Sequence, residues 1–220
     1  MKEEEEEEDE EILLSPTLPD IYVQLLFHVF AANIFFGFVA IFVSIIPFHN
    51  HHLAYMQTIH GAMGAGVAFV CAYLLLFLGA WHGGTRVIST SYILLSLSTG
   101  LLIGFLNNLL EYPTLAQFLM VSCVQSFAIV IYTYISPRSV ALMPVWITMF
   151  FFSAPVCYFL VAKMENPTLN GALIVAALLL SFYNLYYIHV GKMRYDATWR
   201  NKLIALARYY CEIPMLLCGK

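Results

Sequence analysis

The residues best suited to chemistry lie in the last apolar stretch of the chain, from Lys202 to Gly219. This stretch holds two opposite charges, Arg208 and Glu212. If it crosses a lipid bilayer, each charge costs roughly 2.5–3.5 kcal/mol at the centre of the helix. Residues four apart lie on the same face of a helix, so the two side chains can form an ion pair that lowers this cost. The pair predicts either a functional polar site inside a helix bundle or a structural ion pair, and both interpretations stay open.

The end of the preceding apolar run supplies three more polar side chains. Asn184, Tyr187 and His189 lie within the sequence Tyr-Asn-Leu-Tyr-Tyr-Ile-His. Aromatic residues near a helix end are typical of the interfacial belt of membrane proteins. A histidine titrates near neutral pH, and His189 can face the charged stretch. The candidate polar or ion site therefore consists of Glu212, Arg208, Tyr187, Asn184 and His189.

The other reactive residue types do not gather into a catalytic or metal site. His49, His51 and His52 have no carboxylate or cysteine beside them, and we expect His82 and His189 on the opposite membrane face. The five cysteines stand singly in apolar runs, without the paired spacing of zinc sites or disulfide frameworks. We predict no enzyme, no catalytic residue, no metal site and no cofactor, and calcium is the one ion that stays open.

The N-terminal tail contains a sequence that resembles an acidic dileucine sorting signal. Asp9 is followed, after three spacers, by Leu13 and Leu14. Such signals are addresses read by clathrin adaptors in the cytosol. The run of glutamates before them cannot bury apolar surface, so we predict that residues 1–20 are a disordered acidic tail. The alternative is a solvated tail that ends in an apolar pair at the membrane surface.

Composition determines the class of protein to which these residues belong. Of 220 residues, 61% are apolar and 11% are charged, and the mean hydropathy is +0.78. Ten of the fourteen acidic residues precede residue 21, so the body of the chain is poor in charge and slightly basic. A soluble domain needs far more polar surface, and a basic stripe that binds nucleic acid is missing from the sequence. The chain is therefore predicted to be a multi-pass membrane protein whose first partner is the lipid bilayer.

Seven apolar runs can be separated by their polar and proline-containing boundaries, because about 20 apolar residues cross a bilayer core as a helix. Residues 21–220 are thus predicted to be an all-α, seven-helix transmembrane domain, with six clear spans and a weaker, charged seventh. Small residues from Gly61 to Gly66 predict a close helix contact in the second span. The spans are approximately 21–48, 53–81, 87–110, 114–135, 139–162, 169–191 and 202–219.

The distribution of Lys and Arg predicts the orientation of the chain. Lys and Arg collect on the side of the N-terminus, which the positive-inside rule assigns to the cytosol. We therefore expect a cytosolic N-terminus and residence in endoplasmic reticulum, Golgi or endosomal membranes. The residues on that side are Lys2, Arg86, Arg138, Lys192, Arg194, Arg200 and Lys202.

The first apolar run resembles the transmembrane Bax-inhibitor-motif (lifeguard) family. That family has a Tyr-x2-Leu-x2-Gln pattern, which is similar to the sequence at Tyr22 and Leu25, with His28 in place of Gln. The fourth run, Ala116 to Ile135, is similar to the family's long run of Thr and aromatic residues before a charged turn. Over residues 18–217 the resemblance implies a seven-helix bundle of Bax-inhibitor type with a cytosolic N-terminus and minimal loops.

The third run matches the same family less closely. It is similar in length to the family's Pro-x-Asn-x5-Phe-Thr stretch and matches it at Thr99. It departs from that stretch at Ser89, Ser91 and Ser98.

The resemblance also bears on the acidic residues. The family's proposed calcium and pH sensor pairs one acid in the sixth helix with one in the seventh. The sixth-helix motif, Tyr-Asp-Thr, is similar to Tyr186-Tyr187-Ile188, which lacks the aspartate. The seventh-helix motif, Leu-Tyr-Leu-Asp, is similar to Tyr209-Tyr210-Cys211-Glu212, where Glu212 supplies the acid. This loss of half the pair resembles the divergent seven-span members encoded by cytomegaloviruses, which are associated with immune evasion.

Two functions follow from these patterns. The resemblance implies a regulator of cell death and host-cell signalling. The missing sixth-helix acid favours action through interactions with other membrane proteins and through trafficking. The alternative is a weakly selective cation (calcium) leak channel of internal membranes, in which Arg208 partly neutralises Glu212.

Overall fold

The computed structural model describes residues 18–49, 58–82, 84–110, 114–135, 141–162, 167–191 and 199–217. At some helix ends only the backbone is described, and the side chains of residues 212–217 are among those left out. The described residues form seven helices and confirm the all-α prediction. They are α2 (Leu18–His49), α3 (Ile59–His82), α4 (Thr85–Leu110), α5 (Thr114–Ile135), α6 (Leu142–Ala162), α7 (Pro167–Gly191) and α8 (Trp199–Leu217).

Six of these helices, α2 to α7, are long and apolar enough to cross a membrane. They also expose large apolar side chains along their length. Phe42 on α2 and Phe151 on α6 are 68% and 75% exposed. Soluble monomers rarely expose so much apolar surface to water, whereas the acyl chains of a bilayer solvate it. The multi-pass membrane character expected from composition is therefore supported, and α8 is the less apolar exception.

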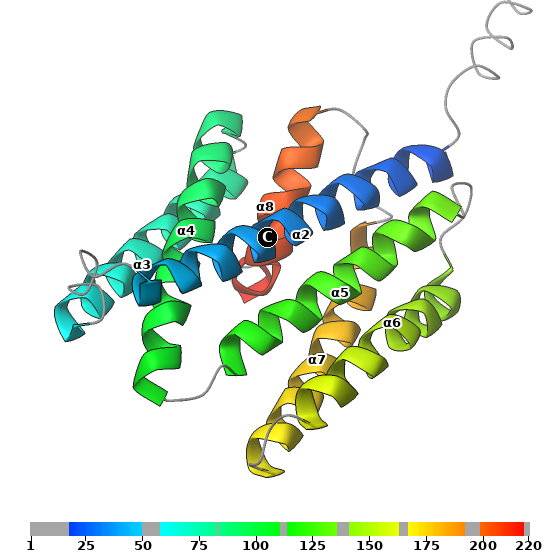
Figure 1. The fold of residues 1–220 in the computed structure, drawn as a ribbon. Helices are drawn as coiled ribbons and strands as arrows, with labels where there is room; N and C mark the ends of the chain where they lie inside the picture. Colours follow the sequence, from blue (N-terminus) through cyan, green and yellow to red (C-terminus); the bar gives the residue numbers. More distant parts are fainter. Residues whose placement is uncertain are drawn as a thin grey trace, which may run out of the picture.

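The helices pack around a centre formed by α2 and α8. Figure 1 shows these two helices crossing, with α3 and α4 on one side and α5, α6 and α7 on the other. α2 packs along α4 and α5, α3 packs along α4, and α6 packs against α5 and α7. α8 contacts α2, α3 and α4. The last helix is thus enclosed by its neighbours, as a helix with polar groups must be in a bilayer.

A close approach of two helices lies elsewhere than the sequence predicted. Cβ atoms added at Gly64 and Gly66 would meet nothing within 4 Å, so the predicted contact of this stretch is wrong at these two positions. Small residues reveal no neighbour by themselves, and these glycines lie on an uncovered face of α3. The close approach is instead at Gly100 and Gly104 of α4, spaced as in small-xxx-small helix contacts. A Cβ added at Gly100 would lie 2.6 Å from the carbonyl oxygen of Ala40 on α2, and one added at Gly104 would lie 2.8 Å from that of Ser44.

Candidate functional site

The site is built around Asn184, a residue of α7 with no exposed surface. Its Nδ2 donates to Oε1 of Gln125 on α5 at 3.2 Å. Its Oδ1 accepts a hydrogen bond from the Tyr209 hydroxyl of α8 at 2.7 Å. One amide side chain therefore links three helices. A buried amide in an apolar bundle needs such partners, since leaving them unmade costs the full desolvation of the group.

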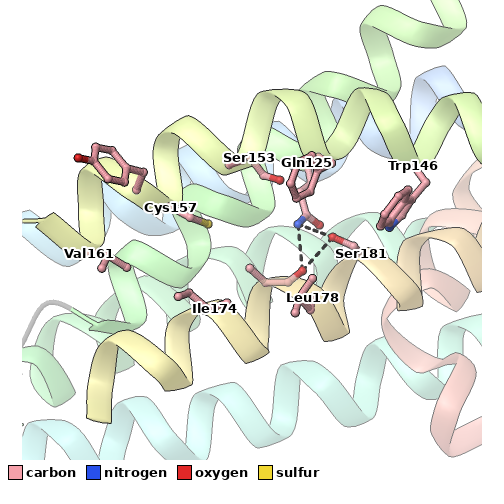
Figure 2. A pocket seen from close by; sticks show the side chains of 12 residues that line it. Gln125, Trp146, Ser153, Cys157, Val161, Ile174, Leu178 and Ser181 are labelled. Carbon is pink, nitrogen blue, oxygen red and sulfur yellow. Dashed lines mark hydrogen bonds between the residues drawn. The ribbon is translucent and has the colours of Figure 1, made fainter. Parts of the chain in front are cut away.

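Gln125 completes this half of the site. Its Nε2 donates to the carbonyl oxygen of Ala177 at 3.0 Å and to the Ser181 hydroxyl at 2.8 Å. Figure 2 shows the Gln125 amide directed toward Ser181. With Oε1 bonded to Asn184, the nitrogen and the oxygen of the amide both have partners, and the side chain is fully buried.

A second amide repeats the arrangement between α2, α5 and α8. Nδ2 of Asn33 donates to the Ser126 hydroxyl at 2.6 Å, and its Oδ1 accepts from the Tyr210 hydroxyl at 2.5 Å. We call the joined groups the polar network. It consists of Asn33, Gln125, Ser126, Ser181, Asn184, Tyr209 and Tyr210.

Further tyrosines hold the backbone of α8. The Tyr187 hydroxyl donates to the backbone carbonyl oxygen of Ala205 at 2.7 Å. The Tyr73 hydroxyl of α3 donates to the backbone carbonyl oxygen of Tyr210 at 3.0 Å. The Tyr183 hydroxyl donates to the carbonyl oxygen of Tyr209. The ring of Tyr209 also meets the ring of Tyr187 edge-on at 5.1 Å between centroids. α8 is therefore fixed from α2, α3 and α7 by uncharged groups.

The structure brings together part of the site that the sequence predicted. Asn184 and Tyr187 both contact α8, and Arg208 lies half-buried on α8 beside Tyr209. His189 lies exposed near the end of α7. Glu212 belongs to α8, but its side chain is outside the described residues, so its ion pair with Arg208 stays a prediction. The sorting residues Asp9, Leu13 and Leu14 also lie outside the described residues.

Sequence reasoning missed Asn33 and Gln125, which are as central as Asn184. Their signal was available, since each is a side-chain amide in the middle of a long apolar run. An amide at such a position is expected to hydrogen-bond across helices. The partner tyrosines, Tyr209 and Tyr210, lie in the middle of α8, and the sequence alone does not state which side chains of other helices they face.

The chemistry that the polar network can support is limited, because its groups carry no formal charge. The polar network contains amides and hydroxyls only, and no group of three or more His, Cys, Asp or Glu gathers within the described residues. A cavity of about 290 Å³ lies beside the network and is lined in part by Asn33, Tyr209 and Tyr210. Groups of this kind can hold a helix interface or a neutral polar molecule. Each of the three amide oxygens accepts one hydrogen bond from a neighbouring helix.

Comparisons with known proteins identified no relative of the chain. Scans against protein-family models, curated proteins and solved structures each found no match to the chain.

Proposed function

We propose that this chain is a membrane-embedded regulator of the Bax-inhibitor-like kind, which acts on cell death and host-cell signalling by binding other membrane proteins. One observation carries the proposal. The buried amides at the junction of α2, α5, α7 and α8 are satisfied by neutral side chains and backbone of the same chain. A centre of this kind stabilises the helix bundle. Contacts with other membrane proteins are then left to the exposed apolar faces of the helices.

The same observation weighs against the calcium-leak alternative. A cation that passes between α7 and α8 must separate Asn184 from Tyr209, which are joined at 2.7 Å. The groups of the polar network that such a cation would meet carry no formal charge, because they are amides and hydroxyls. Carbonyl oxygens can replace hydration water in an ion filter. Here, however, each amide oxygen already accepts one hydrogen bond from another helix, so one of its two lone pairs is occupied.

The place of α8 supports the kinship on which the proposal draws. The resemblance implies six clear helices and a charged, weaker seventh. α8 carries Arg208 and Glu212, lies outside the six candidate spans, and contacts α2, α3 and α4. A cytosolic N-terminus, residence in internal membranes and recognition of Leu13 and Leu14 by clathrin adaptors belong to the same proposal and rest on the sequence.

Reconstitution distinguishes the two functions. The full chain is placed in liposomes that contain a trapped calcium indicator, and calcium entry is followed across a range of pH. We expect entry no faster than in protein-free liposomes. Glu212→Gln should leave the rate of calcium entry unchanged, because in this proposal the neutral polar network, and not Glu212, keeps the centre of the bundle closed. Calcium entry that Glu212→Gln abolishes would overturn the proposal in favour of the leak channel.

A cell experiment tests the regulatory half of the proposal. Levels of membrane proteins at the cell surface are compared with and without the chain, using the wild type and a Leu13→Ala/Leu14→Ala variant. We expect the wild type to lower the surface level of a defined set of membrane proteins and the variant to restore it, because the variant lacks the adaptor signal. A wild type that leaves all surface levels unchanged would contradict regulation by diverted traffic.

A further inference from the structure

A groove of about 290 Å³ runs between α6 and α7, with Gln125 of α5 at its floor (Figure 2). On α6 its lining residues recur every three or four positions from Trp146 to Val161, and on α7 they do so from Ile174 to Ser181. Residues with this spacing share one face of a helix. At 1.5 Å per residue, the lined part of α6 is roughly 22 Å long. The groove therefore follows the helix axes and is long and narrow.

Three polar side chains of the groove, Gln125, Ser153 and Ser181, have hydrogen-bond partners within the chain. Nε2 of Gln125 donates to Ala177 and Ser181, and Oε1 accepts from Asn184. The Ser153 hydroxyl donates to the carbonyl oxygen of Met149 at 2.6 Å, and the Ser181 hydroxyl donates to that of Ala177 at 2.9 Å. A buried water needs two to four polar partners, and apolar cavities without them stay dry. The hydrogen-bond donors of the floor are occupied, so an apolar occupant fits this groove better than water does.

The surroundings of the groove point to one such occupant. Its rim includes Phe150, Tyr158 and Leu178, which are 57%, 78% and 44% exposed. Both α6 and α7 are long and apolar enough to cross a membrane. The groove therefore opens toward the acyl chains of the bilayer. An unfilled space there would lose dispersion contacts along its whole lining, and lipid chains lie roughly parallel to the helices that flank it.

We propose that the groove between α6 and α7 binds the hydrocarbon chain of a bilayer lipid. Its volume lies near the lower end of the roughly 300–1,000 Å³ typical of small-molecule sites, and apolar walls with a few polar groups are typical of them too. This site depends on the membrane-spanning character of α6 and α7 and not on the proposed regulatory function. Since Gln125 and Ser181 belong to both, the bound chain lies directly against the polar network.

Photo-crosslinking tests the proposal directly. The full chain is reconstituted in phosphatidylcholine vesicles that include a phosphatidylcholine with a diazirine on its acyl chain, and adducts are mapped by mass spectrometry after irradiation. We expect adducts at Ala154 and Cys157, which line the groove, to exceed those at Phe151 and Phe159. The two phenylalanines lie outside the groove on the same helix and are 75% and 62% exposed. Groove labelling no higher than at these two residues overturns the proposal.

A matched pair of variants separates the groove from the general lipid surface. Ala154→Phe places a ring in the groove, and Ala172→Phe makes the same change at an exposed position of α7 outside it. We expect groove adducts to be lost in the first variant and retained in the second. Adducts that persist in Ala154→Phe overturn the proposal.

A photoreactive amino acid at the rim tests whether something other than lipid occupies the groove. With p-benzoylphenylalanine in place of Tyr158, on the rim, irradiation in vesicles should yield chains heavier by one lipid. Covalent dimers of the chain in place of lipid adducts would assign the groove to a second copy and overturn the proposal.

Discussion

Replacing Gln125 with leucine removes the centre of the polar network at nearly constant volume. The substitution deletes three interhelical hydrogen bonds, two donated by Nε2 and one accepted by Oε1. Interhelical hydrogen bonds in membrane proteins average about 0.6 kcal/mol each, which gives about 2 kcal/mol for three. The Nδ2 of Asn184 also loses its acceptor, and an unsatisfied buried donor costs roughly 1–3 kcal/mol. We expect Gln125→Leu to lower the free energy of unfolding by roughly 3–5 kcal/mol.

The free energy of unfolding is measured by titrating SDS into mixed micelles while far-UV circular dichroism reports helix content. Gln117→Leu is the matched control on the same helix. Oε1 of Gln117 is buried without a hydrogen-bond partner among the described residues, so its removal should be neutral or slightly stabilising. Combining Gln125→Leu with Asn184→Leu should cost less than the sum of the two single changes, because they share a hydrogen bond. Equal losses for Gln125→Leu and Gln117→Leu, or strict additivity in the cycle, would refute the network as described.

Two further predictions use matched substitutions in the same unfolding assay. Gly100→Ala places a Cβ 2.6 Å from the carbonyl oxygen of Ala40; this should force α4 away from α2 and cost about 1–3 kcal/mol of stability. Gly64→Ala meets nothing within 4 Å and should be neutral or gain up to about 1 kcal/mol in helix propensity; equal effects at the two glycines would contradict the helix contact. Tyr209→Phe keeps the ring but removes the hydrogen bond to Asn184 and should cost about 1 kcal/mol. Tyr186→Phe, at a 43% exposed position, should leave stability unchanged, and a similar loss in both tyrosine variants would count against the bond.

The helices were readable from the sequence because their signal is local. Runs of about 20 apolar residues bounded by polar turns need no tertiary information to be recognised. α5 ends at Ile135 and α6 at Ala162, as the boundaries at Ser136 and Lys163 predicted. Such runs do not tell which face of each helix packs against a neighbouring helix. Gly64 and Gly100 both stand in runs of small residues, and only Gly100 faces a neighbouring backbone.

The site was readable in part for the same reason. Asn184 and Tyr187 stood out as polar residues at the end of an apolar run, and both contact α8. Gln125, the partner of Asn184, is 59 residues away from it along the chain, and Asn33 is 177 residues away from its partner Tyr210. Nothing in one sequence states which helices lie side by side. The amides themselves were a signal, because a lone amide in a bilayer must find a partner. The identity of that partner requires the fold.

Protection of exposed apolar side chains by lipid tests the central claim, that these helices cross a bilayer, most directly. In a background without the five native cysteines, Phe151→Cys and Arg138→Cys are reconstituted in vesicles and treated with a membrane-impermeant maleimide. Phe151 is 75% exposed on the protein surface in the middle of α6, whereas Arg138 lies between the candidate spans of α5 and α6. In leaky vesicles, where both faces are reached, we predict labelling of the cysteine at 138 and none at 151 until SDS is added. Labelling at 151 as fast as at 138 would contradict a membrane-spanning α6.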